Sequence, residues 1–295
     1  MASSGGIRQR IRSVRNIQHI TKAMKMVAAA RLRRAQAQAV SSKPFALKIQ
    51  EMLANVAAVE KEIVHPLLLA REVKNVVYYV VGADKGLAGA YNSNVAKLAA
   101  AELKGRANAQ LVTVGRKMRE YFSRRKYKII ESLESFSEKP GYQNAVEIAH
   151  SMTTKYIAGE FDEINIIYTQ FYSPLRQIPI VVKVLPVEPP KYEEFGESGL
   201  VRSKGLPRSD KEYIFEPGPK ETLTLLVPRY LETLIYAALI NAAASELGSR
   251  MTAMSAATDN SAEIIAKLTL YYNKVRQAAI TREITEIVGG AEALK

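Results

Sequence analysis

Near its carboxyl end the chain reads YLETLIYAALINAAASELGSRMTAMSAATDNSAEIIAKLTLYYNKVRQAAITREITEIV (230–288), without a proline and with Gly248 as the one glycine. Apolar residues recur in it at spacings of three and four, the pattern of an amphipathic helix. They are Leu231, Leu234, Ala238, Ala242, Leu247, Met251, Met254, Ile264, Leu268, Tyr271, Val275, Ile284 and Ile287. Gly289 and Gly290 follow, as is common where helices end. Residues 228–288 therefore predict one helix roughly 90 Å long.

A second long helix is predicted over residues 7–57. Its apolar residues have the same spacing: Ile7, Ile11, Val14, Ile17, Ile20, Met24 and Val27. No Pro or Gly interrupts it between Ile7 and Ser42, and Pro44 either kinks or punctuates it. At roughly 75 Å, such a helix is too long for a compact domain of this size to bury. Two such helices at opposite ends of one chain most simply pair as an antiparallel coiled coil.

The middle of the chain alternates between strand and helix patterns. Apolar strand patterns are at 76–81, 110–115, 128–130, 163–171 and 177–187, and helix patterns at 93–104, 116–126 and 142–159. This alternation predicts an α/β domain with a mostly parallel sheet, in which 163–171 and 177–187 pair with each other. Residues 188–220 are rich in Pro, Glu, Gly and Lys and predict a surface linker or loop.

The predicted fold class is α/β, with a Rossmann-like domain inserted between the N- and C-terminal helices of a long antiparallel coiled coil. The predicted boundaries are 1–60 for the N-terminal helix, 70–190 for the α/β domain, 191–219 for the linker and 220–295 for the C-terminal helix.

Composition narrows the possible functions. The 295 residues include no cysteine, which excludes disulfides, thiolate metal sites and thiol redox switching. The three histidines, His19, His65 and His150, have no spacing that could begin a metal site. No apolar run approaches the roughly 20 residues of a membrane-spanning helix, and no secretory signal is expected.

Positive charge is concentrated at the beginning of the chain. The net charge is +13, and residues 1–50 hold eleven Lys or Arg and no Asp or Glu. Such a face is either simply solvated or meets an acidic partner, for which nucleic acid, anionic lipid and an acidic protein surface all qualify. Nucleic-acid binding through RLRRA (31–35) would favour interleaved aromatic residues, yet the first aromatic residue is Phe45.

Three local motifs have both a functional and a structural interpretation. The turn GADKGLAGAYN (82–92) follows a strand, as a phosphate-binding loop would, but it lacks G-x-G-x-x-G and G-K-[ST]. A tight turn in which Gly86 and Gly89 avoid steric clash explains it better. Glu283 and Glu286 are best read as a solvated helix face. Asp259 and Asn260 are poor helix formers that either mark a contact or are simply exposed.

Four segments resemble the signature blocks of F-type ATP synthase gamma subunits: ITKAMKMVAAARLRRA (20–35), DKGLAGAYN (84–92), SRMTAMSAATDN (249–260) and YNKVRQAAITREITEIV (272–288). They are in the family's order and span nearly the whole chain. The resemblance implies a bacterial-type rotor shaft that couples ion-driven rotation of the membrane c-ring to the catalytic beta subunits. It also implies a subunit with no active site, no cofactor and no metal of its own.

The same resemblance implies partners and contact residues. The partners are the alpha3beta3 hexamer, the epsilon subunit and the c-ring, with the chain peripheral to the cytoplasmic face of a bacterial plasma membrane. The implied hexamer contacts are Met24, Lys25, Arg250, Asp259, Asn260, Gln277, Thr281 and Glu286. Position 25 is Lys where many relatives have Glu, and the cysteine pair of the chloroplast members is absent.

Two other classes of function stay open on the sequence. A basic coiled-coil protein that binds nucleic acid is the main alternative, and salt-dependent binding to duplex DNA would favour it. An α/β nucleotide-binding enzyme is the other, and tight ATP binding by the isolated chain would favour that.

Overall fold

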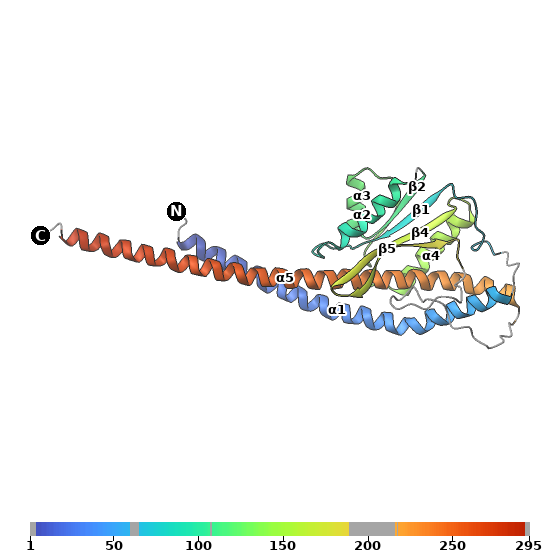
Figure 1. Ribbon diagram of the computed structural model, residues 1–295, viewed down its shortest axis with the longest axis horizontal. Coiled ribbons are helices and arrows are strands. Elements are labelled where there is room, and N and C mark those ends of the chain that lie inside the picture. Colours follow the sequence, from blue (N-terminus) through green and yellow to red (C-terminus); the bar gives the residue numbers. More distant parts are fainter. Residues whose placement is uncertain (1–3, 60–64, 107, 189–215, 217, 293–295) are drawn as a thin grey trace. The chain divides into compact units, whose positions relative to one another are not determined.

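The computed structural model describes residues 4–59, 65–106, 108–188, 216 and 218–292. Along the chain the elements are α1 (Ser4–Val59), β1 (Val76–Val81), α2 (Tyr91–Lys104), β2 (Ala109–Val114), α3 (Arg116–Arg124), β3 (Ile129–Leu133), α4 (Tyr142–Ile157), β4 (Glu163–Ser173), β5 (Arg176–Leu185) and α5 (Pro219–Glu292) (Figure 1). The chain divides into two compact units, a sheet unit (Ala28–Arg250) and a two-helix unit (Met1–Val27 with Met251–Lys295). Both long helices contribute to both units.

The sheet unit is built on five strands in the order β3-β2-β1-β4-β5. β1 is parallel to β2 and to β4, β2 is parallel to β3, and β4 is antiparallel to β5. β1 is the central strand, and all six of its residues are buried. A continuous apolar run such as VVYYVV is typical of a parallel strand that is covered on both faces. The predicted mostly parallel sheet and the pairing of its last two strands are confirmed.

Helices cover both faces of this sheet (Figure 1). On one face, Val76, Tyr78 and Val80 of β1 pack with apolar residues of α2 and α3. On the other face, Val77 and Tyr79 pack with α4 and α5, and with the end of α1 through Leu53 and Val56. The alternation along β1 follows from the two-residue period of a strand. The long helices are therefore part of the core of the sheet unit.

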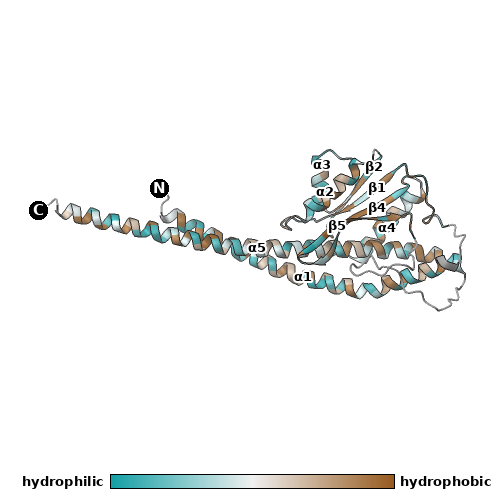
Figure 2. Cartoon of the chain, viewed as in Figure 1, coloured by the Kyte–Doolittle hydropathy of each residue, from teal (hydrophilic) through white to brown (hydrophobic). Residues whose placement is uncertain are grey.

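In the two-helix unit, α1 and α5 run antiparallel. The hydroxyl groups of Thr21 and Thr258 lie 2.8 Å apart, and Arg8 Nη2 donates to the hydroxyl of Tyr272 over 2.6 Å. Positions on α5 rise as positions on α1 fall, which confirms the predicted antiparallel pairing. Hydrophilic and hydrophobic residues alternate along both helices, as the amphipathic pattern requires (Figure 2).

Several predicted bounds differ from the structure. α5 begins at Pro219, next to the predicted domain boundary at 220 but before the predicted helical pattern of 228–288, and Pro228 lies inside the helix, as Pro44 lies inside α1. The expectation that Gly289 and Gly290 end the helix was wrong, because α5 continues through them to Glu292. A proline removes one donor from a helix, and the packing of Val227 and Leu231 in the core favours continuing through it. Most of the predicted linker, residues 191–215 and 217, lies outside the described residues.

The expectation that no segment is long and apolar enough to span a membrane was wrong for α5. Within the described residues, α5 has an 18-residue window with a mean hydropathy of 1.4, long and apolar enough to cross a membrane. Much of the apolar surface of α5 is nevertheless enclosed by protein, because Ile235, Leu239 and Ala242 belong to the core beside the sheet. A core helix passes the same test.

Candidate functional site

The contact residues expected in the two-helix unit lie at two separate levels along the helices. Met24 and Lys25 are half-buried on α1, where Lys25 Nζ donates to Ser255 Oγ over 2.9 Å. The expected contact residues on α5 are all exposed: Asp259, Asn260, Gln277, Thr281 and Glu286. The first two lie about a turn beyond Ser255, and Gln277 lies roughly 27 Å further along the helix axis. The structure therefore brings Lys25 close to the 255–260 segment and places 277–286 at a separate level.

Large apolar side chains are also exposed along this unit. Ile20 and Met26 on α1 are 60% and 59% exposed, and Leu270 and Ile287 on α5 are 72% and 71% exposed. Apolar residues scattered over a surface are common in folded proteins, so these four by themselves do not define an interface. The two-helix unit therefore presents exposed apolar side chains on both helices and exposed polar residues on α5.

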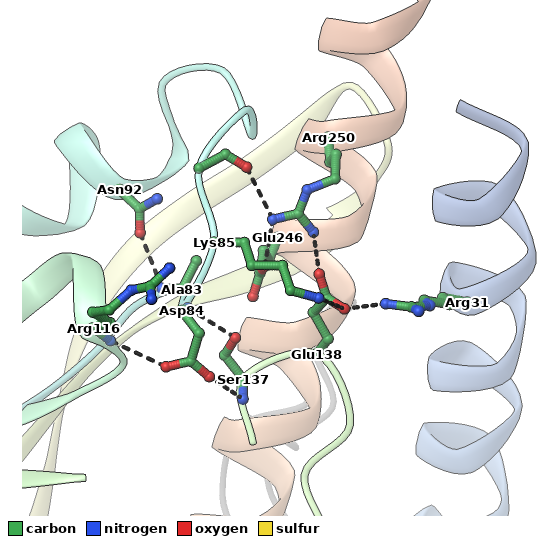
Figure 3. A network of polar contacts seen from close by, with 11 residues as sticks. Arg31, Ala83, Asp84, Lys85, Asn92, Arg116, Ser137, Glu138, Glu246 and Arg250 are labelled. Carbon is green, nitrogen blue, oxygen red and sulfur yellow. Dashed lines mark hydrogen bonds and ion pairs between the residues drawn. The ribbon is translucent and has the colours of Figure 1, made fainter. Parts of the chain in front are cut away.

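Arg250 lies elsewhere, inside the sheet unit, with its side chain 6% exposed. Its guanidinium donates to Glu138 Oε1 over 3.1 Å, to the carbonyl oxygen of Gly86 over 3.2 Å and to Glu246 Oε1 over 2.6 Å (Figure 3). These acceptors belong to the β3–α4 loop, the β1–α2 loop and α5 itself. The expected hexamer contact is thus a buried residue that makes three hydrogen bonds within the chain.

Glu138 forms ion pairs with basic residues from three segments of the chain. Its Oε1 accepts from Arg250 of α5, and its Oε2 accepts from Lys85 of the β1–α2 loop over 3.2 Å and from Arg31 of α1 (Figure 3). The Glu138 side chain is 15% exposed. Both carboxylate oxygens are therefore used, and a single carboxylate joins both long helices to the loops above the sheet.

The turn after β1 uses its polar groups internally. The carboxylate of Asp84 accepts from the backbone N–H groups of Arg116 and Ser137, each over 3.1 Å. Burial raises the pKa of the Asp84 carboxyl, but these hydrogen bonds outweigh it and lower the pKa below its usual value. The N–H groups of Ala83 and Asp84 donate to Asn92 Oδ1 and Ser137 Oγ. In a phosphate-binding loop such N–H groups would face the ligand.

The glycines of this turn have different reasons for being glycine. Gly89 has a φ of +54°, a conformation that favours glycine, as the sequence led us to expect. Gly86 is different, because an added Cβ would meet nothing closer than Lys117 Cε at 4.0 Å. The steric need lies instead at Gly82, where a Cβ would come within 2.5 Å of Met118 Cγ. The expectation that Gly86 is needed to avoid a steric clash was therefore wrong. What Gly86 contributes in the structure is its carbonyl oxygen, which accepts a hydrogen bond from Arg250.

Glu246 is the second carboxylate of the network and is 1% exposed on its side chain. Burial raises the pKa of its carboxyl to about 7, although Arg250 opposes that rise. Its Oε2 and the hydroxyl of Tyr91 are both buried without a hydrogen-bond partner among the described residues. Burial, followed by the charge of Glu246, raises the pKa of Tyr91 as well.

Glu138 and Glu246 were missed by the sequence analysis. Glu246 had a readable signal, because it is the one charged residue between Glu232 and Arg250 and lies one helical turn before that arginine. Glu138 had none, since its partners come from positions far away along the chain. Within the described ranges, no group of His, Cys, Asp or Glu could hold a metal ion.

Comparison with known proteins gives a consistent result over the whole chain. The family model described as ATP synthase matches residues 3–294. The ATP synthase gamma chain of Desulforamulus reducens is 48% identical over 295 residues, with 100% of both chains covered. That of Moorella thermoacetica is 46% identical over 296 residues, again with 100% of both chains covered.

Solved structures show the same similarity. The Tetrahymena thermophila mitochondrial ATP synthase central stalk and c-ring contains a chain with a TM-score of 0.61 and 25% identity, covering 81% of this chain and 99% of that one. A chain of the Euglena gracilis mitochondrial ATP synthase has a TM-score of 0.67 at 16% identity, covering 99% and 94%, and supports the fold alone.

Proposed function

This chain belongs to the family of ATP synthase gamma chains, and we propose that it is the central rotor shaft of a bacterial F-type ATP synthase. In that role it couples ion-driven rotation of the c-ring to conformational change at the catalytic beta subunits, and the same cycle runs backwards in ATP-driven ion pumping. The observation that carries the proposal is the antiparallel pair of long helices with exposed apolar and basic residues, in a chain matched end to end by gamma chains.

We infer that the chain is a non-catalytic subunit. The turn after β1, where an α/β nucleotide-binding protein would hold phosphate, has the N–H groups of Ala83 and Asp84 committed to Asn92 and Ser137. The carboxylates that cluster nearby, Glu138 and Glu246, are paired with arginine and lysine side chains. Such an arrangement favours a structural role over acid–base chemistry.

The proposed partners are the alpha3beta3 hexamer, the epsilon subunit and the c-ring. The acid-free, basic first 50 residues suit acidic loops of the beta subunits. Individual exposed ion pairs contribute only about 0–1 kcal/mol, which suits a surface that must release its partner at each step. The proposed location is the cytoplasmic face of the bacterial plasma membrane, as a peripheral part of the membrane-associated complex.

Within the hexamer, the proposed contacts are Met24, Lys25, Asp259, Asn260, Gln277, Thr281 and Glu286, which are exposed or half-buried in this chain. Arg250 belongs to the same proposed set by resemblance alone. Its guanidinium binds Glu138, Glu246 and Gly86 and its side chain is 6% exposed, so a contact with the hexamer requires that Arg250 become more accessible than it is in this chain.

The proposal is tested by assembly and coupling. The chain is expressed with the alpha, beta, epsilon, c and remaining subunits from the same genome and reconstituted into vesicles. We expect one copy per alpha3beta3 hexamer and ATP-driven ion pumping that is lost when this chain is omitted. Micromolar binding of ATP to the isolated chain would argue against a non-catalytic shaft, and assembly without it of a fully coupled enzyme would overturn the role.

No observation favours a second function. The full-length similarity to gamma chains replaces the alternative of a basic coiled-coil protein that binds nucleic acid.

A further inference from the structure

We propose that the Glu138 carboxylate is the joint through which turning of the sheet layers is passed to the two long helices. Glu138 is in this sense a positioning residue for rotary coupling. The inference rests on the proposed function as a rotor shaft, and it concerns how the shaft and the α/β layers are made to turn as one body.

The joint connects three separate segments at one point. Arg31 is on α1, Arg250 is on α5 and Lys85 is in the loop after the central strand, and all three donate to Glu138 (Figure 3). Glu138 itself is in the loop after β3. Besides the core packing of α1 and α5, this carboxylate gives the sheet layers a polar connection to both helices at one place.

The loop that carries Glu138 is fixed at its base. The Ser137 N–H donates to the Asp84 carboxylate, and Ser137 Oγ accepts from the Asp84 N–H over 3.0 Å. Asp84 also holds the first residue of α3 by accepting from the Arg116 N–H. These hydrogen bonds connect the segments that follow β1, β2 and β3. The position of Glu138 is therefore fixed by three neighbouring strands and not by its own loop alone.

Polar contacts of this kind resist sliding in a way that apolar packing does not. The core between α5 and the sheet is mostly aliphatic, and hydrophobic attraction has no preferred direction. Charge-assisted hydrogen bonds from a guanidinium have fixed geometry and are stronger than neutral ones. Polar contacts between Asn241 and Gln170 and between Ser245 and Thr169 also join α5 to β4, but they leave α1 untouched.

The joint is shielded from water on the α5 side and open on the α1 side. The side chains of Arg250 and Glu246 are 6% and 1% exposed, whereas that of Arg31 is 45% exposed. Removing one partner of a buried pair strands the other charge, while exposed partners are readily replaced by water. The geometry therefore assigns the greater share of the mechanical link to the Glu138–Arg250 pair.

The test compares Glu138→Gln with Glu134→Gln in the reconstituted complex. Glu134 is in the same loop but pairs with Arg119 of α3, so the control removes a charge without touching the long helices. Two quantities are measured: ions pumped per ATP hydrolysed, and hydrogen–deuterium exchange of the 134–140 backbone and of α5 around Arg250. Glu138→Asp serves as the conservative variant.

We expect Glu138→Gln to accelerate exchange at both places by about tenfold, which corresponds to about 1.4 kcal/mol. We also expect it to lower the number of ions pumped per ATP relative to the control. Glu138→Asp should recover part of both, and Glu134→Gln should match the unmodified complex in pumping.

Either of two results would overturn the inference. Unchanged hydrogen–deuterium exchange in Glu138→Gln would mean that the carboxylate does not stabilise the contact between the 134–140 loop and α5. Faster exchange with an unchanged pumping ratio would mean that it serves stability alone. Failure of the unmodified chain to support pumping would count against the proposed function instead, so the two failures are distinguishable.

Discussion

The two-helix unit and the sheet unit differ in how deeply each buries an arginine that joins a long helix to another segment of the chain. Arg8 of α1 donates to Tyr272 at an exposed position. Arg250 of α5 is buried between the carboxylates of Glu138 and Glu246. Both are arginines that bind another segment of the chain. Arg250 makes more hydrogen bonds than Arg8 and is more deeply buried, and both differences predict a larger contribution to stability.

The sharpest way to break this comparison is to truncate both arginines. Arg250→Ala strands Glu138 and Glu246 and should lower the free energy of unfolding by about 3–5 kcal/mol. Arg8→Ala removes an exposed contact and should cost at most about 1 kcal/mol. Denaturant unfolding of the full-length variants measures both. Similar losses from the two substitutions would show that the two units do not differ in the proposed way.

The pH dependence of stability sharpens the same contrast. The Glu246 carboxyl has a pKa of about 7 when folded, against a usual value of 4.5. Between these values the folded chain holds a proton that the unfolded chain has lost, so stability falls as pH rises from about 4.5 to about 7 and then levels off. The fall is on the order of 3 kcal/mol.

Glu246→Gln should remove this slope, because the amide does not titrate. The groups that face Glu246 are Arg250 on its own helix, Ser137 and Glu138 of the β3–α4 loop and Tyr91 of α2. Unfolding is measured in urea at several pH values between 5 and 8. A slope that survives in Glu246→Gln would assign it to another group, and Glu263→Gln in the two-helix unit is the matched control.

A glycine pair tests the comparison within one helix. An added Cβ at Gly248 would come within 2.9 Å of Gln177 Nε2 and 3.2 Å of Phe171 Cε2, whereas at Gly289 it would meet nothing within 4 Å. Crowding costs typically 1–3 kcal/mol and the gain in helix propensity is up to about 1 kcal/mol. Gly248→Ala should therefore destabilise by about 1 kcal/mol, and Gly289→Ala should stabilise slightly. Thermal unfolding measures the sign, which should be opposite in the two variants.

The smallest expected change in stability is at the proposed hexamer contacts. Thr281→Ala removes an exposed hydroxyl and should alter the free energy of unfolding by no more than about 0.5 kcal/mol. It should nevertheless slow ATP-driven turnover of the reconstituted complex. A variant with normal turnover and normal stability would remove Thr281 from the proposed contact set.

The sequence predicted the architecture well because both helical and strand periods are explicit in it. The long apolar stripes of 7–57 and 228–288 indicate helices, and the short, β-branched and aromatic run VVYYVV indicates a buried strand. The antiparallel pairing was inferred from two overlong helices at opposite ends of one chain. The predicted boundary at 220 lies next to the observed start of α5 at Pro219, but the helical pattern was followed only from Pro228, whereas packing of Val227 and Leu231 continues the helix through that proline.

The polar network around Glu138 could not be predicted from the sequence, for a physical reason. Arg31, Lys85, Glu138 and Arg250 are up to 219 positions apart, and only the fold brings them together. Local patterns report the period of one element, not which loop lies against which helix. The exposed contact residues, in contrast, were named by resemblance, and they stay predictions until the assembled complex is measured.

The order β3-β2-β1-β4 makes the boundary between β1 and β4 the place where α/β proteins of this topology commonly receive a ligand. Here the chain fills that neighbourhood with its own helix. Asn241 Oδ1 accepts from Gln170 Nε2 near the end of β4 over 3.1 Å, and Arg250 binds the carbonyl of Gly86 in the turn after β1. To open a nucleotide pocket at this position, the side chains of α5 that occupy it would first have to be removed. The same helix that fills this crevice continues to Glu292, so no ligand site could be gained there without giving up the shaft.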